Sequence, residues 1–340
     1  MISRRHLLKT TLNSVLAAGA SALGFPNLSE AQSIPVKIGD INSYTPEIER
    51  FSEPYRLGLW LAQNEINESG GLYGRPIEII SRNDLGSKTE AIRLAEHLID
   101  EQKVDVICGS ILSDISIALS EYCRKRQVTF LASISLSDSL ALGNGSPYTY
   151  QLRPNTFMQS QMLALESSKL PVTRWASLAP DYSFGRDCVR NFQHFISNVR
   201  PDVEWVHDEW FELHKLNPKD ALERLKSKNI DALFNVSFGQ DLDRLINDEN
   251  ADPFFKKITT VSIFTGTPES LQTLRSPILN NWLVSGYPWD QIKIKEHKRF
   301  VESYQQRFNQ TPVETSLNGY IAIHALAAAY SNNPDLPLFQ

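Results

Sequence analysis

The chain has 340 residues, of which 41% are hydrophobic and 21% charged, a composition typical of a globular protein, and its length predicts two domains. Its net charge of −5, with no basic block, argues against nucleic acid as a partner. No stretch reaches the roughly 18 consecutive apolar residues that predict a membrane-spanning helix.

Residues 1–31 have the pattern of an export signal. A basic start, MISRRHLLK, precedes the mildly apolar stretch TLNSVLAAGASAL, and SEA before Gln32 fits a small-x-small cleavage site. The motif SRRHLLK resembles the twin-arginine signal, although leucine stands where phenylalanine is commoner. The alternative is an ordinary secretion signal with two chance arginines. By either route we expect an exported, periplasmic protein.

Strand and helix patterns alternate along the first half of the chain. Short apolar runs predict strands at 36–41, 76–81, 104–108 and 128–133. Apolar residues at helical spacing predict helices around 55–66, 92–99 and 113–126. This alternation is typical of a parallel sheet whose strands are joined by right-handed crossover helices.

The same theme restarts after GSPYTYQLRPN (145–155). Apolar runs predict strands at 174–179, 203–210, 230–236 and 258–264. Helical spacing predicts helices at 189–199, 218–229, 240–250 and 268–274. A strand at 281–289 leaves this half, and helices near 295–309 and 316–331 follow. The sequence therefore predicts two similar α/β lobes.

The cysteines, Cys108, Cys123 and Cys188, are odd in number and show no CxxC spacing. Cys108 ends an apolar run and Cys123 falls in a helical pattern, as small buried side chains do. We predict no structural disulfide, although an exported compartment would permit one.

The ordered set of these segments resembles the type I periplasmic solute-binding proteins of ABC transporters, in particular the leucine/isoleucine/valine-binding family. The most specific block is EINESGGLYGRPIEI, in which a helix ends in paired glycines and a glycine-arginine-proline turn starts a strand. Other matching blocks include VDVICGSILSDISIAL, GSPYTYQLRPN, LAPDYSFGRD, IDALFNVSFGQD and FVESYQQRFNQTP, and the set extends over nearly all of residues 36–331.

The resemblance implies a fold of two doubly wound parallel-sheet lobes joined by a hinge, with the ligand held between the lobes. It implies an N-terminal lobe of residues 36–150 plus 288–340 and a C-terminal lobe of residues 151–287. The expected partners are a small-molecule ligand and a membrane ABC permease. We expect a monomer without cofactor, metal or enzymatic activity.

The chain departs from the family pattern in three ways. NSYTPEIER replaces the usual glycine-rich turn after the first strand, and several ligand-gripping residues do not match. Family members usually continue through a third hinge crossing, whereas this chain stops at Gln340. Either this branch of the family is short or the chain is incomplete.

The first candidate site residue, Ser113, matches the ligand-binding serine of the family. It stands where a predicted helix begins after a strand, and unpaired N–H groups at such a place bind carboxylates. Its hydroxyl could donate to a ligand carboxylate or cap the helix. The family often has glycine where this chain has Asp114, whose carboxylate could stabilise the helix start or meet a ligand ammonium.

The second candidate loop is ASISLSDSL (132–140). The resemblance places Leu136 at the ligand-binding threonine of the family, so that hydroxyl is lost. Ser135 or Ser137 could replace it. The alternative is a polar turn without ligand contact.

In the second lobe, the resemblance places Phe184 and Phe238 where the family often has a ligand-facing tyrosine. Core packing is the alternative for each. Thr265 follows the strand at 258–264, where amino-acid binders use a glutamate for the ligand ammonium, and the next acidic residue here is Glu269. Tyr287 lies at the expected second hinge crossing and could line the cleft or stiffen the hinge.

The aromatic residues and the scarcity of charge favour a flat or apolar ligand held at one polar end. We expect an aromatic or aliphatic carboxylate or, alternatively, a branched-chain amino acid. Two other functions stay open, an exported ligand-sensing module feeding a membrane receptor and an exported hydrolase. The sequence has no HExxH, GxSxG or P-loop motif, and the candidate loops offer serines but no partner histidine.

Overall fold

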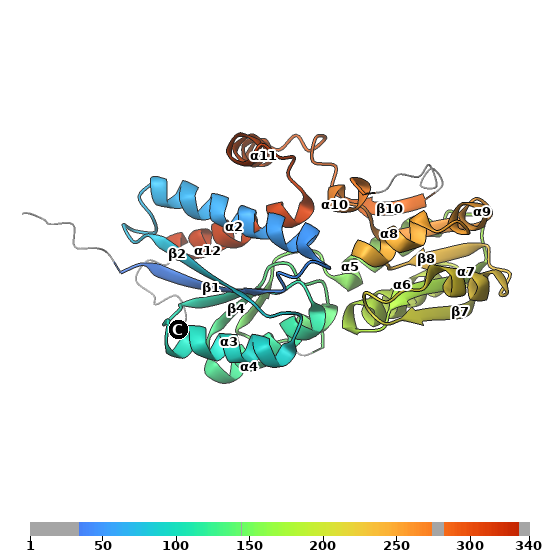
Figure 1. Ribbon diagram of the computed structural model, residues 1–340, viewed down its shortest axis with the longest axis horizontal. Helices are drawn as coiled ribbons and strands as arrows, with labels where there is room; N and C mark the ends of the chain where they lie inside the picture. Colours follow the sequence, from blue (N-terminus) through green and yellow to red (C-terminus); the bar gives the residue numbers. More distant parts are fainter. Residues whose placement is uncertain (1–33, 144, 274–281, 333–340) are drawn as a thin grey trace, which may run out of the picture. The chain divides into compact units, whose positions relative to one another are not determined.

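The computed structural model describes residues 34–143, 145–273 and 282–332 (Figure 1). The predicted export signal at residues 1–31 lies outside this range. Within the described ranges, no helix combines the length and the apolar character needed to cross a membrane.

Five parallel strands form the first sheet, in the order β2-β1-β3-β4-β5. They are β1 (Val36–Asn42), β2 (Ile77–Asn83), β3 (Val106–Gly109), β4 (Thr129–Ala132) and β5 (Thr149–Gln151). The helices around this sheet are α2 (Glu49–Glu68), α3 (Lys88–Asp100), α4 (Ser113–Arg126), α11 (Lys295–Phe308) and α12 (Glu314–Asn332).

The helices of this lobe divide between the two faces of the sheet. α2 and α12 cover one face and α3 and α4 the other (Figure 1). In α2, the buried residues Tyr55, Leu59 and Ala62 recur at helical spacing and therefore face the sheet together. α11 packs on the outside of α2, through Phe300 and Tyr304.

The second sheet also has five parallel strands, in the order β10-β9-β8-β6-β7. They are β6 (Arg174–Pro180), β7 (Glu204–Phe211), β8 (Ala232–Asn235), β9 (Thr259–Gly266) and β10 (Trp282–Gly286). α5 (Thr156–Ser167) and α6 (Ser183–Val199) pack on one face. α7 (Pro218–Lys226), α8 (Gly239–Asn247) and α9 (Ala251–Phe255) pack on the other, and the short α10 (Pro268–Leu271) follows β9.

The prediction of two doubly wound parallel-sheet lobes is confirmed, because each sheet is all-parallel and covered on both faces. The short apolar runs that predict strands lie in these sheets, where both faces bury them. The three cysteines, Cys108, Cys123 and Cys188, are buried and unpaired. Burial raises the pKa of each thiol, so none has the character of a reactive thiolate.

α2 and α12 approach each other so closely that glycine is needed on both helices. A Cβ on Gly58 would lie 2.0 Å from the carbonyl oxygen of Ser316. A Cβ on Gly319 would lie 2.2 Å from the carbonyl oxygen of Tyr55. In both cases the obstacle is backbone, which cannot rotate away as a side chain can.

We expect Gly319→Ala to lower the free energy of unfolding by about 1–3 kcal/mol, because the added methyl group forces the two helices apart. Urea unfolding followed by circular dichroism measures the loss. Gly143→Ala is the matched control, since a Cβ there meets no atom closer than 3.7 Å. Equal stability of the Gly319 variant and the wild type would contradict the close helix contact.

A carboxyl group lies buried in the first sheet. Asp40 in β1 has no exposed surface, and its Oδ2 accepts a hydrogen bond from the hydroxyl of Tyr44. Its Oδ1 has no hydrogen-bond partner among the residues described. Burial raises the pKa of Asp40 from 3.8 to about 6.

Because this pKa is higher in the folded state than in the unfolded chain, the ionised carboxylate costs stability above pH 6, and the cost disappears as the pH falls from 6 towards 4. We therefore expect Asp40→Asn to gain up to about 3 kcal/mol relative to the wild type between pH 4 and pH 8. Urea unfolding of both proteins at the two pH values measures this. A stability difference that is independent of pH would contradict a buried ionising carboxyl.

Candidate functional site

A small cavity of about 20 Å³ lies where the carboxyl ends of strands from both sheets come together. The first lobe contributes side chains from α2, from the loops after β3 and β4, and from the start of α12: Phe51, Ile111, Ser113, Ile134, Leu136 and Thr315. The second lobe and the connection leading to it contribute Arg153, Tyr182, Phe184, Phe238 and Phe264. Ligands of open α/β sheets bind at such strand ends, so this cavity is the candidate site.

Aromatic rings form most of the wall. The ring centroid of Phe184 lies 5.7 Å from that of Phe238 and 5.4 Å from that of Phe264. Phe51 reaches over from the first lobe, with its centroid 6.1 Å from that of Phe238 and 6.4 Å from that of Phe264. These separations are typical of favourable edge-to-face and tilted packing. Phe184 and Phe238 thus pack in the core and face the cavity at once.

Ser113 is the first residue of α4, but it does not cap the helix. The N-cap residue is Leu112, and no side chain bonds to the free N–H groups of the first turn. The cap interpretation of Ser113 is therefore wrong. Its side chain is almost fully buried, and among the described residues its hydroxyl has no hydrogen-bond partner.

Arg153 brings a second polar group to the cavity. Its Nη1 donates to the carbonyl oxygen of Ile134 at 3.3 Å, and its Nη2 pairs with the carboxylate of Glu314. Its Nε is buried and has no hydrogen-bond partner in the part of the chain described. Burial raises the pKa of the nearby Tyr182, so this phenol stays protonated and can donate.

Asp114 points away from the cavity and joins the two lobes. The backbone N–H of Ser183 donates to its Oδ1 at 3.3 Å, and the hydroxyl of Ser183 donates to the same oxygen. Lys88 lies 3.2 Å from its other oxygen. Burial opposes the charge, but the bonds from Ser183 and Lys88 leave the pKa of Asp114 below its usual value. Asp114 is therefore an ionised structural contact between α4 and α6.

Ser137 takes part in a second contact between the lobes. Its hydroxyl donates to Oδ2 of Asp187 at 2.6 Å. Arg190 donates to Asp187 at 2.8 Å and to the neighbouring Asp138 at 3.0 Å, so two buried carboxyl groups share one guanidinium. These bonds join the loop after β4 to α6.

The structure does not place the other candidate residues around the cavity. Ser135 is fully buried, and its Oγ has no partner in the described ranges. Thr265 shares a 2.8 Å hydrogen bond with Ser262, and Tyr287 shares one of 2.6 Å with His297. Glu269 accepts hydrogen bonds from the backbone and the hydroxyl of Thr315, and burial raises the pKa of its carboxyl.

Seven residues of the cavity wall were not singled out from the sequence: Phe51, Ile111, Ile134, Arg153, Tyr182, Phe264 and Thr315. Phe264 ends the predicted strand at 258–264, and Tyr182 stands two residues before Phe184, so the rule that strand ends form sites could have indicated both. Phe51 lies on a helix and gives no such signal.

A family model described as periplasmic binding protein matches residues 35–332. A Leu/Ile/Val-binding protein homolog of Brucella suis is 21% identical over 345 aligned positions, which cover 96% of this chain and 82% of the relative.

Solved structures of similar fold include a solute-binding protein from R. palustris in complex with benzoate, with TM-score 0.77 and 18% identity, covering 87% of this chain and 80% of that one. Another is the branched-chain amino acid transporter substrate-binding protein of Streptococcus pneumoniae in complex with isoleucine, with TM-score 0.75 and 20% identity, covering 87% and 84%. At these identities the likeness concerns the fold. The match of the family model over most of the described residues shows that the chain belongs to the periplasmic binding protein family.

Proposed function

We propose that this protein is the periplasmic substrate-binding component of an ABC importer, and that it captures a small organic carboxylate between its two lobes. Export follows the twin-arginine route, and the protein acts as a monomer without catalytic activity. Hinge strands divide it into an N-terminal lobe of residues 36–150 plus 288–340 and a C-terminal lobe of residues 151–287. Support comes from the family match and from a cavity built by both lobes.

The observation that carries the choice of ligand is the chemistry of the cavity wall. The polar groups that can donate to a carboxylate there are the Ser113 and Tyr182 hydroxyls and the Arg153 Nε. Among the residues that line it in the described chain, none carries a carboxylate that would balance a ligand ammonium. Aromatic rings surround the remaining space. This combination favours an aromatic or aliphatic carboxylate over an amino acid.

The relatives support both classes of ligand. Neighbouring structures contain benzoate and 3,4-dihydroxybenzoic acid, and another contains isoleucine. A branched-chain amino acid is therefore the second candidate. Its ammonium group would have to be held by carbonyl or hydroxyl oxygens alone, in contact with Arg153.

Binding requires the cavity to enlarge, because about 20 Å³ holds one water molecule and no organic acid. We infer that the lobes separate at the hinge to admit the ligand and close on it afterwards. The bonds from Asp114 to Ser183 and from Ser137 to Asp187 then form again. Contacts made only in the closed form are the ones through which a ligand shifts the equilibrium.

The two other functions make different predictions. An exported hydrolase needs a base beside its nucleophile, and the described cavity wall has Ser113 but no histidine. An exported sensory module would use the same lobes. A permease and an ATPase encoded beside this chain would support transport, whereas a neighbouring sensor kinase would support signalling.

Titration of the protein's tryptophan fluorescence tests the ligand class. We expect saturable micromolar binding of benzoate or a related aromatic acid and much weaker binding of leucine and isoleucine, because the cavity lacks a partner for the ammonium. Micromolar binding of leucine with no response to any aromatic or aliphatic acid would overturn the proposed ligand.

Ser113→Ala tests the anchor for the carboxylate. We expect affinity for the bound acid to fall by about 1–3 kcal/mol, or roughly fivefold to 150-fold, because a buried carboxylate oxygen loses its donor. Isothermal titration measures the change. Ser135→Ala is the matched control, a buried serine of the first lobe that lies outside the cavity wall. Equal affinity of the Ser113 variant and the wild type would remove this serine from the site.

A further inference from the structure

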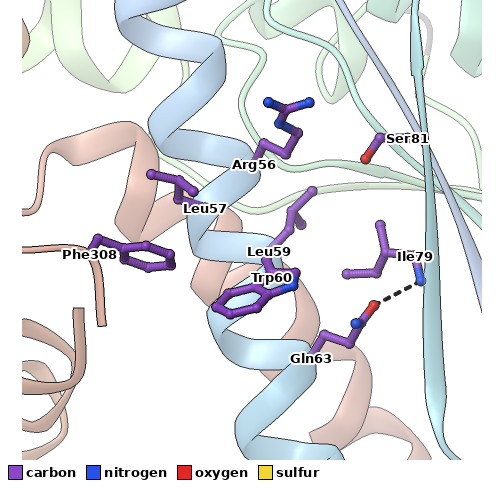
Figure 2. A pocket seen from close by; sticks show the side chains of 8 residues that line it. All are labelled: Arg56, Leu57, Leu59, Trp60, Gln63, Ile79, Ser81 and Phe308. Carbon is purple, nitrogen blue, oxygen red and sulfur yellow. Dashed lines mark hydrogen bonds between the residues drawn. The ribbon is translucent and has the colours of Figure 1, made fainter. Parts of the chain in front are cut away.

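A second and larger pocket lies on the first lobe, away from the cavity between the lobes. Its volume is about 440 Å³, within the range of small-molecule sites. Figure 2 shows it between α2 and β2, with Arg56 and Ser81 near one end and Gln63 near the other. Phe308, the last residue of α11, also lines the pocket and lies on the side of α2 that is away from β2 (Figure 2).

β2 is an edge strand, and α2 covers part of its free edge with amide side chains. The backbone N–H of Ile77 donates to the side-chain oxygen of Asn67 at 2.7 Å. Two residues further along, the N–H of Ile79 donates to the side-chain oxygen of Gln63 at 2.9 Å (Figure 2). The two helix residues, Asn67 and Gln63, are four positions apart, and the two strand residues are two positions apart. Both separations span about 6 Å, so the helix and the strand stay in step.

This series of caps stops at Ser81. The N–H of Asp84 donates to the carbonyl oxygen of Asn42 in β1. Successive N–H groups along a strand point to opposite edges, so the N–H groups of even-numbered residues in β2 point to β1 and those of odd-numbered residues point to the free edge. The helix residue four before Gln63 is Leu59, which is buried and has no acceptor. Within the described residues, the N–H of Ser81 therefore has no partner, and it borders the pocket.

An added β-strand does not fit this edge. Pairing with another chain needs a continuous row of free N–H and C=O groups. The side chains of Asn67 and Gln63 already occupy that row at Ile77 and Ile79. A small molecule that supplies one acceptor at Ser81 is compatible with the caps, whereas an extended peptide is not.

The rest of the wall is flat and apolar. Trp60 is 38% exposed, and its ring centroid lies 5.7 Å from that of Phe308. The guanidinium of Arg307 lies 4.6 Å from the centre of the Trp60 ring and holds it in place. Ile79 faces Trp60 from β2 (Figure 2). The pocket's volume of about 440 Å³ is large enough for a planar ring.

The charged group at the pocket already has a partner. Arg56 is paired with Glu53 at 2.5 Å. Among the described residues that line the pocket, Arg56 is the one that carries a charge. An anion would have to compete with Glu53 for this guanidinium, so the free N–H favours a neutral acceptor such as a carbonyl oxygen.

We propose that this pocket is a second binding site, which takes a neutral aromatic molecule with a carbonyl acceptor, of the aromatic amide class. The ring lies against Trp60 and Ile79, and the carbonyl oxygen accepts from the N–H of Ser81. The site is independent of ligand capture between the lobes.

Backbone amide and tryptophan indole NMR shifts of the isotope-labelled protein test this, with benzamide, benzoate and toluene as probes. We expect benzamide to shift the amide of Ser81 and the indole of Trp60. Followed through these two signals, which report on this pocket alone, benzamide should bind at least tenfold more tightly than toluene or benzoate, wherever else benzoate binds. If toluene binds this pocket as tightly as benzamide, the hydrogen bond from the Ser81 N–H to the ligand is contradicted. If benzoate binds it as tightly, the preference for a neutral ligand is contradicted.

Two variants separate this site from the cavity between the lobes. Trp60→Gln removes the aromatic wall at an exposed position and places an amide near Ser81, so we expect at least a tenfold loss of benzamide affinity. Phe238→Ala changes the other cavity and should leave benzamide binding unchanged. Benzamide binding that Trp60→Gln leaves intact, or that Phe238→Ala abolishes, would place the ligand elsewhere and contradict the second site.

Discussion

The packing of four phenylalanine rings against one another is the interaction on which the arrangement of the site depends. Phe184, Phe238 and Phe264 come from three different segments of the second lobe, and Phe51 comes from the first. Each favourable aromatic pair contributes about 0.5–1.5 kcal/mol beyond the burial of its surface. The same rings fill the space in which a ligand would lie, so capture of a ligand replaces contacts among them by contacts with the ligand.

Charged groups are kept at the rim of this aromatic centre. Asp114 is bonded to Ser183 and paired with Lys88, and Asp138 and Asp187 share Arg190, so protein partners already occupy these carboxyl groups. The charged side chain that reaches the described cavity wall is Arg153. The division gives a physical reason for selectivity, because an anionic group meets free donors, whereas a cationic group meets no free carboxylate.

Much of the fold and part of the site follow from the sequence. Apolar runs and helical spacing predict most strands and helices of both lobes, because burial of each sheet on two faces requires them, but they do not predict β5 or α5. Ser113 lines the cavity at a predicted strand-to-helix joint, and Phe184 and Phe238 line it just past predicted strand ends. The resemblance to the binding-protein family singled out these three positions, and the topology of parallel sheets explains why they lie near one another, because it fixes where strand ends meet.

The remaining residues depend on contacts between distant parts of the chain. Ser137 lies in a loop predicted to reach the ligand, but it bonds to Asp187, fifty residues away in the sequence. Asp114 finds Ser183 at a separation of 69 residues. Phe51 reaches the cavity from the first turn of an amphipathic helix, and nothing in its local pattern distinguishes it from a core residue. Such partners are set by how the lobes meet, which periodicity does not encode.

The most direct test of the central claim, that a carboxylate is captured between the two lobes, is a crystal structure of the protein grown with benzoate. We expect the ring of benzoate to lie between the lobes, in contact with Phe184 and Phe238. We also expect a carboxylate oxygen about 2.7–3.2 Å from a donor of Ser113 or Arg153. Benzoate bound outside the cavity between the lobes, or bound there with its carboxylate turned towards solvent, would contradict the capture of a carboxylate between the lobes.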